Sequence, residues 1–137
     1  MKKLLKFIDT PLIIAVLFAF TASMAFAKDY VIYSIAQDIP MGTPNETIRK
    51  NFYVDMGKNQ GVKKDSVLDV FRIVSVLDPY GGKKRFNHKV KVGELKILHS
   101  EETTSIGVLN KMEDLEETPV LEVNALMIGD LVNVHVK

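Results

Sequence analysis

Apolar residues recur at every second position through several short runs of this sequence. The runs are rich in Val, Ile, Tyr, Phe and Thr, and clusters of Gly, Asn, Asp and Pro separate them. A period of two residues is typical of a strand with one face on a core, and no stretch keeps apolar residues at helical spacing for three turns. We therefore predict an all-β fold, a small closed or partly open antiparallel β-barrel of SH3-like or Greek-key-like type. The predicted strands cover residues 30–36, 51–56, 68–76, 86–97, 103–109 and 131–136.

The segments between these runs have the composition of turns. Residues 38–45 contain two prolines and a glycine and predict a loop, while residues 46–50 are compatible with one helical turn. Residues 78–82 read Asp-Pro-Tyr-Gly-Gly, in which proline presets the first corner and glycine accepts the second. Several turns also carry a carboxylate just before a strand, where it can accept backbone amide hydrogen bonds. The residues to which we assign turn or bend roles are Gly57, Gly61, Asp65, Gly81, Gly93, Gly129 and Asp130.

Two predicted strands have irregular patterns. Apolar residues fall in both phases of 68–76, so we expect this strand to be covered on both faces for part of its length, with Arg72 as a polar interruption. In 86–97 the apolar phase changes across Gly93. An uninterrupted strand would send the two halves to opposite faces, so we predict a bulge or sharp bend at Gly93.

Residues 1–27 have the parts of a signal peptide. Lys2, Lys3 and Lys6 form a basic front, residues 11–20 are an apolar run, and residues 25–27 form a small-x-small cleavage site. The alternative is a retained inner-membrane anchor, although the apolar run is somewhat shorter than the roughly 20 residues of a spanning helix. We expect cleavage, which would leave a periplasmic or secreted chain of residues 28–137.

Charge and cysteine content narrow the function classes. Cleavage would remove three lysines and one aspartate and so change the net charge from +1 to −1. A nucleic-acid-binding domain normally has a basic footprint, so we expect no nucleic-acid partner. The chain contains no cysteine, and its fold therefore depends on one ordinary hydrophobic core rather than on disulfides.

The order of motifs in residues 51–136 resembles the small β-barrel domain at the carboxyl end of flagellar assembly protein T. The matching features are Asp-x-Gly-x-x-x-Gly-Val-Lys-x-Asp at 55–65, Val-Phe-Arg at 70–72, the turn at 78–81, Val-Gly-Glu-Leu at 92–95, Ser105, and Ile-Gly-Asp-x-Val at 128–132. Related domains recur in exported bacterial envelope proteins. The resemblance implies a barrel with an envelope binding or assembly role, while the large domains that precede the barrel in the flagellar protein have no counterpart in this sequence.

No motif in the sequence predicts catalysis or a cofactor. His88, His99 and His135 form no i, i+4 pair, and we expect no metal site. Neither a Gly-x-Ser-x-Gly elbow nor a phosphate-binding glycine loop occurs. We expect a noncatalytic protein without cofactors, and the alternative is a small secreted hydrolase, since a catalytic triad is defined by geometry rather than sequence.

Two charged segments are candidate interaction surfaces. The basic one comprises Lys83, Lys84, Arg85, Lys89 and Lys91, and the acidic one Glu113, Asp114, Glu116 and Glu117. Both are interpreted either as solvated hairpin tips or as complementary surfaces for head-to-tail assembly or docking to an envelope protein. The basic segment also suits an anionic surface such as lipid headgroups.

We divide the exported chain into an N-terminal strand and loop, residues 28–50, and a barrel domain, residues 51–137. Residues 30–36 either complete the barrel or form an edge strand that pairs with a partner. Since the family resemblance starts at residue 51, we expect residues 51–137 to remain folded when residues 28–50 are deleted.

Overall fold

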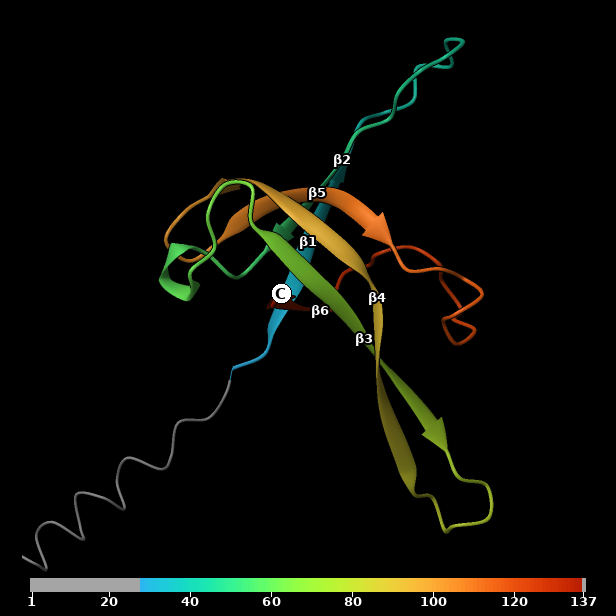
Figure 1. Ribbon diagram of the computed structural model, residues 1–137. Helices are drawn as coiled ribbons and strands as arrows, with labels where there is room; N and C mark the ends of the chain where they lie inside the picture. The colour runs from blue at the N-terminus through green and yellow to red at the C-terminus, as the bar shows by residue number, and fades with distance from the viewer. Residues whose placement is uncertain (1–27, 137) are drawn as a thin grey trace, which may run out of the picture.

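The computed structural model describes residues 28–136, which form a closed antiparallel barrel of six strands (Figure 1). The all-β prediction is confirmed, as is closure of the barrel. The strands are β1 (Tyr30–Gln37), β2 (Lys50–Val54), β3 (Val67–Leu77), β4 (Arg85–Ser100), β5 (Ser105–Met112) and β6 (Leu131–Val134), and a short 3₁₀-helix, η1, spans Lys58–Gln60. The predicted signal peptide, residues 1–27, lies outside the described residues. No helix in residues 28–136 has the length and apolar character needed to cross a membrane.

Strand β1 is an integral part of the barrel wall. The order around the barrel is β1-β2-β5-β4-β3-β6, and β6 pairs back with β1 through Tyr30↔Val132 and Val31↔Leu131. Ile32 of β1 is completely buried. Residues 30–36 therefore complete the barrel, and the boundary that we placed at residue 50 separates β1 from its hairpin partner β2. The expectation that residues 51–137 fold alone conflicts with this arrangement, because deleting β1 would break the closure.

The β1–β2 connection contains no helix, so the helical turn with which residues 46–50 are compatible does not form. Instead, the carboxylate of Glu46 accepts hydrogen bonds from the backbone amides of Met41, at 2.7 Å, and Gly42, at 3.1 Å. These bonds hold residues 41–46 as a wide loop. Strand β2 starts at Lys50, a few residues after that loop.

One apolar core fills the barrel. Its fully or nearly fully buried members are Ile32, Phe52, Val54, Met56, Val62, Leu68, Val70, Val92, Leu95, Ile97, Leu126 and Val132. Every strand except β5 contributes a large apolar side chain to this group. Strand β5 turns Ser105 and Gly107 inward instead, and the Ser105 hydroxyl donates to the carbonyl of Met56 at 2.7 Å. The small residues allow β5 to pass close to β4, because a Cβ on Gly107 would lie 3.1 Å from the carbonyl oxygen of Lys96.

The bulge predicted at Gly93 is present. Val70 of β3 pairs with Gly93, and the next residue, Phe71, pairs with Lys91, which leaves Val92 as the extra residue. This extra residue shifts the alternation so that Val92 and Leu95 both reach the core. A Cβ on Gly93 would lie 2.7 Å from the carbonyl oxygen of Lys111. The glycine is therefore required for the close approach of β4 and β5 at this corner.

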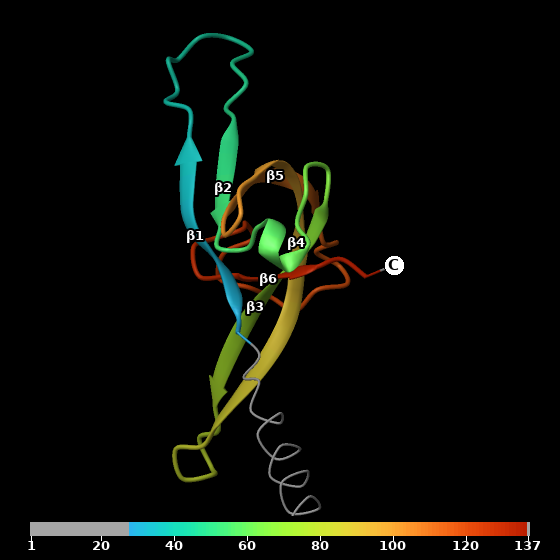
Figure 2. The ribbon, with the colours of Figure 1, turned by 90° about the vertical axis from the view of Figure 1, so that its left-hand side faces the viewer.

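Two hairpin extensions leave the barrel in opposite directions (Figures 1 and 2). One is the β1–β2 connection, residues 38–49. The other is the outer part of β3 and β4, residues 73–89, which we call the β3–β4 arm. Beyond Phe71, β3 has no pairing with β6, and before Gly93, β4 has none with β5. The two strands of the arm therefore pair only with each other among the described residues.

Candidate interaction surfaces

The side chains of β3 that point into the core belong to an alternation that continues into the β3–β4 arm. Leu68 and Val70 point into the core, and the same alternation places Val74 and Val76 on one face of the arm. Phe86 pairs directly with Val76 and lies on that face. Val76 is 52% exposed and Phe86 43% exposed. The arm thus exposes an apolar strip formed by Val74, Val76 and Phe86. The sequence predicts that β3 is covered on both faces for part of its length, and this covering is confined to the end of β3 that lies in the barrel.

Exposed cations surround the end of the arm. Lys83, Lys84 and Arg85, which we call the basic tip, are all exposed. The Lys84 ammonium lies 5.0 Å from the centre of the Phe86 ring, a cation–π distance. Tyr80, at the apex of the turn, is 98% exposed. The amide of Asp78 donates to the carbonyl of Lys84 at 2.8 Å, so the turn that presents these groups is closed by its own hydrogen bond.

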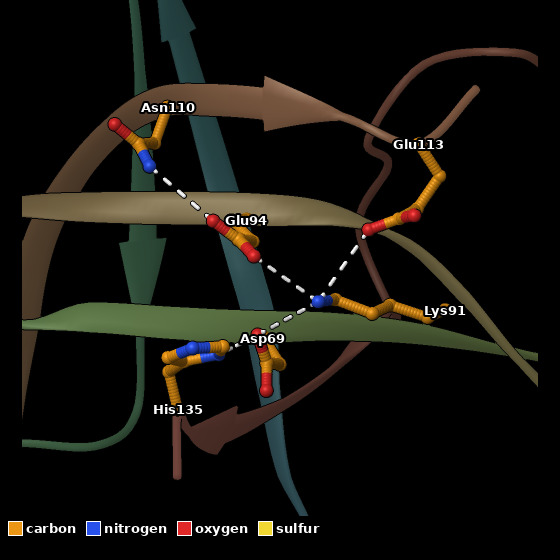
Figure 3. A network of polar contacts seen from close by, with 6 residues as sticks. All are labelled: Asp69, Lys91, Glu94, Asn110, Glu113 and His135. Atoms are coloured by element: carbon orange, nitrogen blue, oxygen red, sulfur yellow. Dashed lines mark hydrogen bonds and ion pairs between the residues drawn. The ribbon is translucent and has the colours of Figure 1, made fainter. Parts of the chain in front are cut away.

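Lys91, the last residue assigned to the basic surface, lies elsewhere. Its ammonium contacts Glu94 at 3.1 Å, Asp69 at 3.2 Å and Glu113 at 3.4 Å, and Figure 3 shows it between these carboxylates. Burial opposes its charge, but hydrogen bonds to Glu94 and Asp69 outweigh that effect and raise the pKa of Lys91. The hydrogen bond from Lys91 in turn lowers the pKa of Glu94. The exposed basic surface therefore consists of the basic tip and Lys89.

The same network contains a group of ligand-type atoms. One atom each from Asp69, Glu94 and His135 lies within 4.8 Å of the others, and His135 Nδ1 is 2.8 Å from Asp69 Oδ1. Asn110 donates to Glu94 at 3.3 Å (Figure 3). The Lys91 ammonium already supplies a positive charge to both carboxylates. The arrangement is an ion-pair network that joins β3, β4, β5 and the segment after β6. Local sequence spacing could not reveal it, because Asp69, Glu94 and His135 are far apart in the chain.

The four residues of the acidic segment have two different roles. Glu113 belongs to the Lys91 network. The Asp114 carbonyl accepts hydrogen bonds from the amides of Glu117 and Thr118, and its carboxylate accepts from the amide of Glu116 at 3.0 Å. These bonds order the turn, while the side chains of Asp114, Glu116 and Glu117 are exposed. We call these three residues the acidic loop.

A buried ion pair fixes the long connection between β5 and β6. Arg72 Nε and Nη2 each donate to the Asp130 carboxylate at 2.8 Å, and the two side chains are 13% and 3% exposed. Arg72 also donates to the carbonyls of Val123 and Ala125, both at 2.6 Å. The hydrogen bond to Asp130 raises the pKa of Arg72. Arg72, a polar interruption in the sequence, is thus the residue that holds residues 123–130 against the barrel.

A groove of about 770 Å³ lies between the β1–β2 hairpin and β5. Its lining residues are Ala36, Gln37, Asp38, Ile48, Arg49, Lys50, Asn51, Phe52, Leu98, Val108, Leu109, Met112, Asn124, Ala125 and Leu126. The groove exists because β2 and β5 diverge. They pair only through Phe52↔Gly107, Tyr53↔Ile106 and Val54↔Ser105, although β5 continues to Met112. Sequence periodicity does not report where two strands separate, so the groove was not predicted.

The turn residues that we singled out have distinct positions. Gly61 and Gly129 have positive φ values of 80° and 95°, and Asp65 adopts φ 68°. Gly57 lies against the backbone of Glu101 and Glu102, where a Cβ would collide. Gly81 closes on Asp78 in the arm turn. Gly93 lies in the β4 bulge rather than in a turn, and Asp130 is a partner of Arg72.

Comparison with models of protein families gives no match for this chain, and no curated protein matches it. The function is therefore inferred from the surfaces themselves.

Proposed function

We propose that this protein is a noncatalytic exported envelope protein that acts as a binding or assembly module in the bacterial periplasm, with the β3–β4 arm as its recognition element. One observation carries the proposal: the apolar phase of the core strand β3 continues into a hairpin that no other described element covers. A two-stranded hairpin is marginally stable in water by itself, and exposed apolar patches mark interaction sites.

The character of the arm indicates the kind of partner. A strip of Val76 and Phe86 suits an apolar protein surface, whereas the basic tip suits carboxylates beside it. The partner is therefore an envelope protein with an acidic rim around an apolar contact. The resemblance to the barrel of flagellar assembly protein T, and with it the SH3-like or Greek-key-like type of barrel, supports a role in a multiprotein envelope assembly, such as the flagellar one.

Localisation is a separate part of the proposal. Cleavage after residue 27 would release the barrel into the periplasm, whereas retention of the leader would tether it to the inner membrane. Amino-terminal sequencing of the protein isolated from cells distinguishes the two. A start at Lys28 supports release, and a start at Met1 supports the tether.

The recognition role is tested by affinity capture from the native envelope fraction. The paired variant Val76→Ser and Phe86→Ser replaces the two most exposed apolar side chains on that face of the arm. The matched control is Ile39→Ser with Met41→Ser, which removes two residues that are 80% and 79% exposed on the opposite hairpin. We expect the arm variant to lose partners that wild type and control both retain. Equal capture by all three proteins would refute the assignment.

A further inference from the structure

The groove beside β5 contains a free strand edge. Residues 108–112 of β5 pair with β4 on one side and with no described strand on the other, since β2 reaches only Gly107. A free edge of this kind is a template for another strand. Main-chain hydrogen bonds to such an edge, with side chains in flanking pockets, are the mode of binding called β-augmentation.

The groove offers apolar contacts next to that edge. Phe52, Met112 and Leu126 line it together with Val108 and Leu109 of β5. Leu109 is 47% exposed. The volume of about 770 Å³ accommodates several side chains of an extended segment. The natural occupant is therefore a strand with apolar side chains and an unpaired edge of its own.

The β3–β4 arm has both properties. Within the arm, at residues 85–89, the edge of β4 that faces away from β3 pairs with no described strand, and Phe86 supplies an apolar side chain near its start. We propose that the β3–β4 arm of one copy of this protein docks in the groove of a second copy, where its β4 strand pairs antiparallel with residues 108–112 of β5. This inference rests on the proposed recognition role of the arm and names its partner.

Charge complementarity fixes the direction of pairing. Strand β5 runs toward the acidic loop, which follows Met112, whereas β4 runs away from the basic tip, which ends at Arg85. Antiparallel pairing consequently brings the three cations of one copy to the three carboxylates of the next. Parallel pairing would place the basic tip at the opposite end of β5, away from those carboxylates.

The contact must join different copies. The groove is lined by the β1–β2 hairpin, and that hairpin leaves the barrel in the direction opposite to the β3–β4 arm (Figures 1 and 2). An arm therefore faces away from its own groove. A contact between two different surfaces is heterologous, and its repetition builds head-to-tail chains or a closed ring.

Sedimentation velocity of the mature protein over a concentration series tests the proposal. The tip variant is Lys84→Glu with Arg85→Glu, and the loop variant is Glu116→Lys with Glu117→Lys. The control is Lys63→Glu with Lys64→Glu, an exposed pair in a different turn. We expect wild type and control to self-associate, and each of the first two variants to associate about tenfold or more weakly. A mixture of the tip variant and the loop variant should associate again, because the acidic tip of the first then meets the basic loop of the second.

Three outcomes would overturn the inference. They are a wild type that stays monomeric, unchanged association of both variants, and failure of the mixture to recover. If the wild type is monomeric while arm-dependent capture of an envelope protein persists, the proposed function stands and the self-assembly falls. Arm-dependent binding of monomers to vesicles containing anionic lipid would likewise assign the basic tip to a membrane and not to a second copy.

Discussion

Replacement of Arg72 by methionine tests the buried ion pair that organises the β5–β6 connection. The substitution keeps an unbranched apolar stem of similar reach but removes all four hydrogen bonds of the guanidinium. Asp130 would retain only the amide of Met127, at 2.9 Å, as a partner in these contacts. Since that carboxylate is 3% exposed, the variant leaves a nearly buried charge without a counter-ion.

Removal of one member of a buried ion pair costs about 3–5 kcal/mol, and two further charged hydrogen bonds to carbonyls are lost here. We therefore expect Arg72→Met to lower the free energy of unfolding by about 4 kcal/mol, a large share of the roughly 5–15 kcal/mol typical of a folded domain. Arg72→Lys keeps the charge but loses the two-pronged geometry, and a loss of about 2 kcal/mol is expected.

Urea unfolding followed by circular dichroism measures these changes, with an unchanged slope m as evidence that only stability has altered. The control is Arg85→Met, because that arginine is exposed on the arm and its replacement should change stability by less than about 0.5 kcal/mol. Hydrogen exchange should also become faster in residues 123–130, which Arg72 holds. If Arg72→Met is as stable as Arg85→Met, the assigned role of the ion pair is wrong.

Three further predictions concern the barrel. In the Lys91 network, the lowered pKa of Glu94 stabilises the fold at pH values above 4.5, the ordinary pKa of this group, and the raised pKa of Lys91 stabilises the fold at pH values below 10.5. Lys91→Met should therefore lower the free energy of unfolding near neutral pH. Urea unfolding at a series of pH values should show this loss shrinking as acid protonates Glu94. Gly93→Ala should lower the free energy of unfolding by about 2 kcal/mol in the same assay, because the added Cβ would lie 2.7 Å from the carbonyl oxygen of Lys111. An unchanged urea midpoint would contradict that packing. Deletion of residues 28–50 removes β1 and should abolish cooperative thermal unfolding, whereas a sharp transition would show that the remaining strands close without it.

Period-two alternation was sufficient to predict the strands and the barrel class, because a strand with one buried face must repeat in this way. The Gly93 bulge was also predictable, since both halves of a strand whose apolar phase changes can face one core only if an extra residue lies between them. The fate of residues 30–36 was not predictable, because the same β-prone sequence suits a wall strand or an edge strand.

The candidate surfaces depended more on tertiary structure. The exposed basic tip follows from a turn rich in lysine, but the pairing of the half-buried Lys91 with Asp69 and Glu94 depends on the bulge that turns it toward them. The role of Arg72 depends on Asp130, which is 58 residues away. The groove arises where β2 ends its pairing with β5, and no residue type marks that point.

The most direct test of recognition by the arm is photo-crosslinking inside cells. A photoreactive phenylalanine derivative would replace Tyr80, at the exposed apex of the arm, or Asn59, an exposed residue of η1, as the control. We predict discrete adducts with a protein partner from position 80 and none from position 59. Adducts of equal yield from both positions, or none from position 80, would contradict the assignment of the arm as the recognition element.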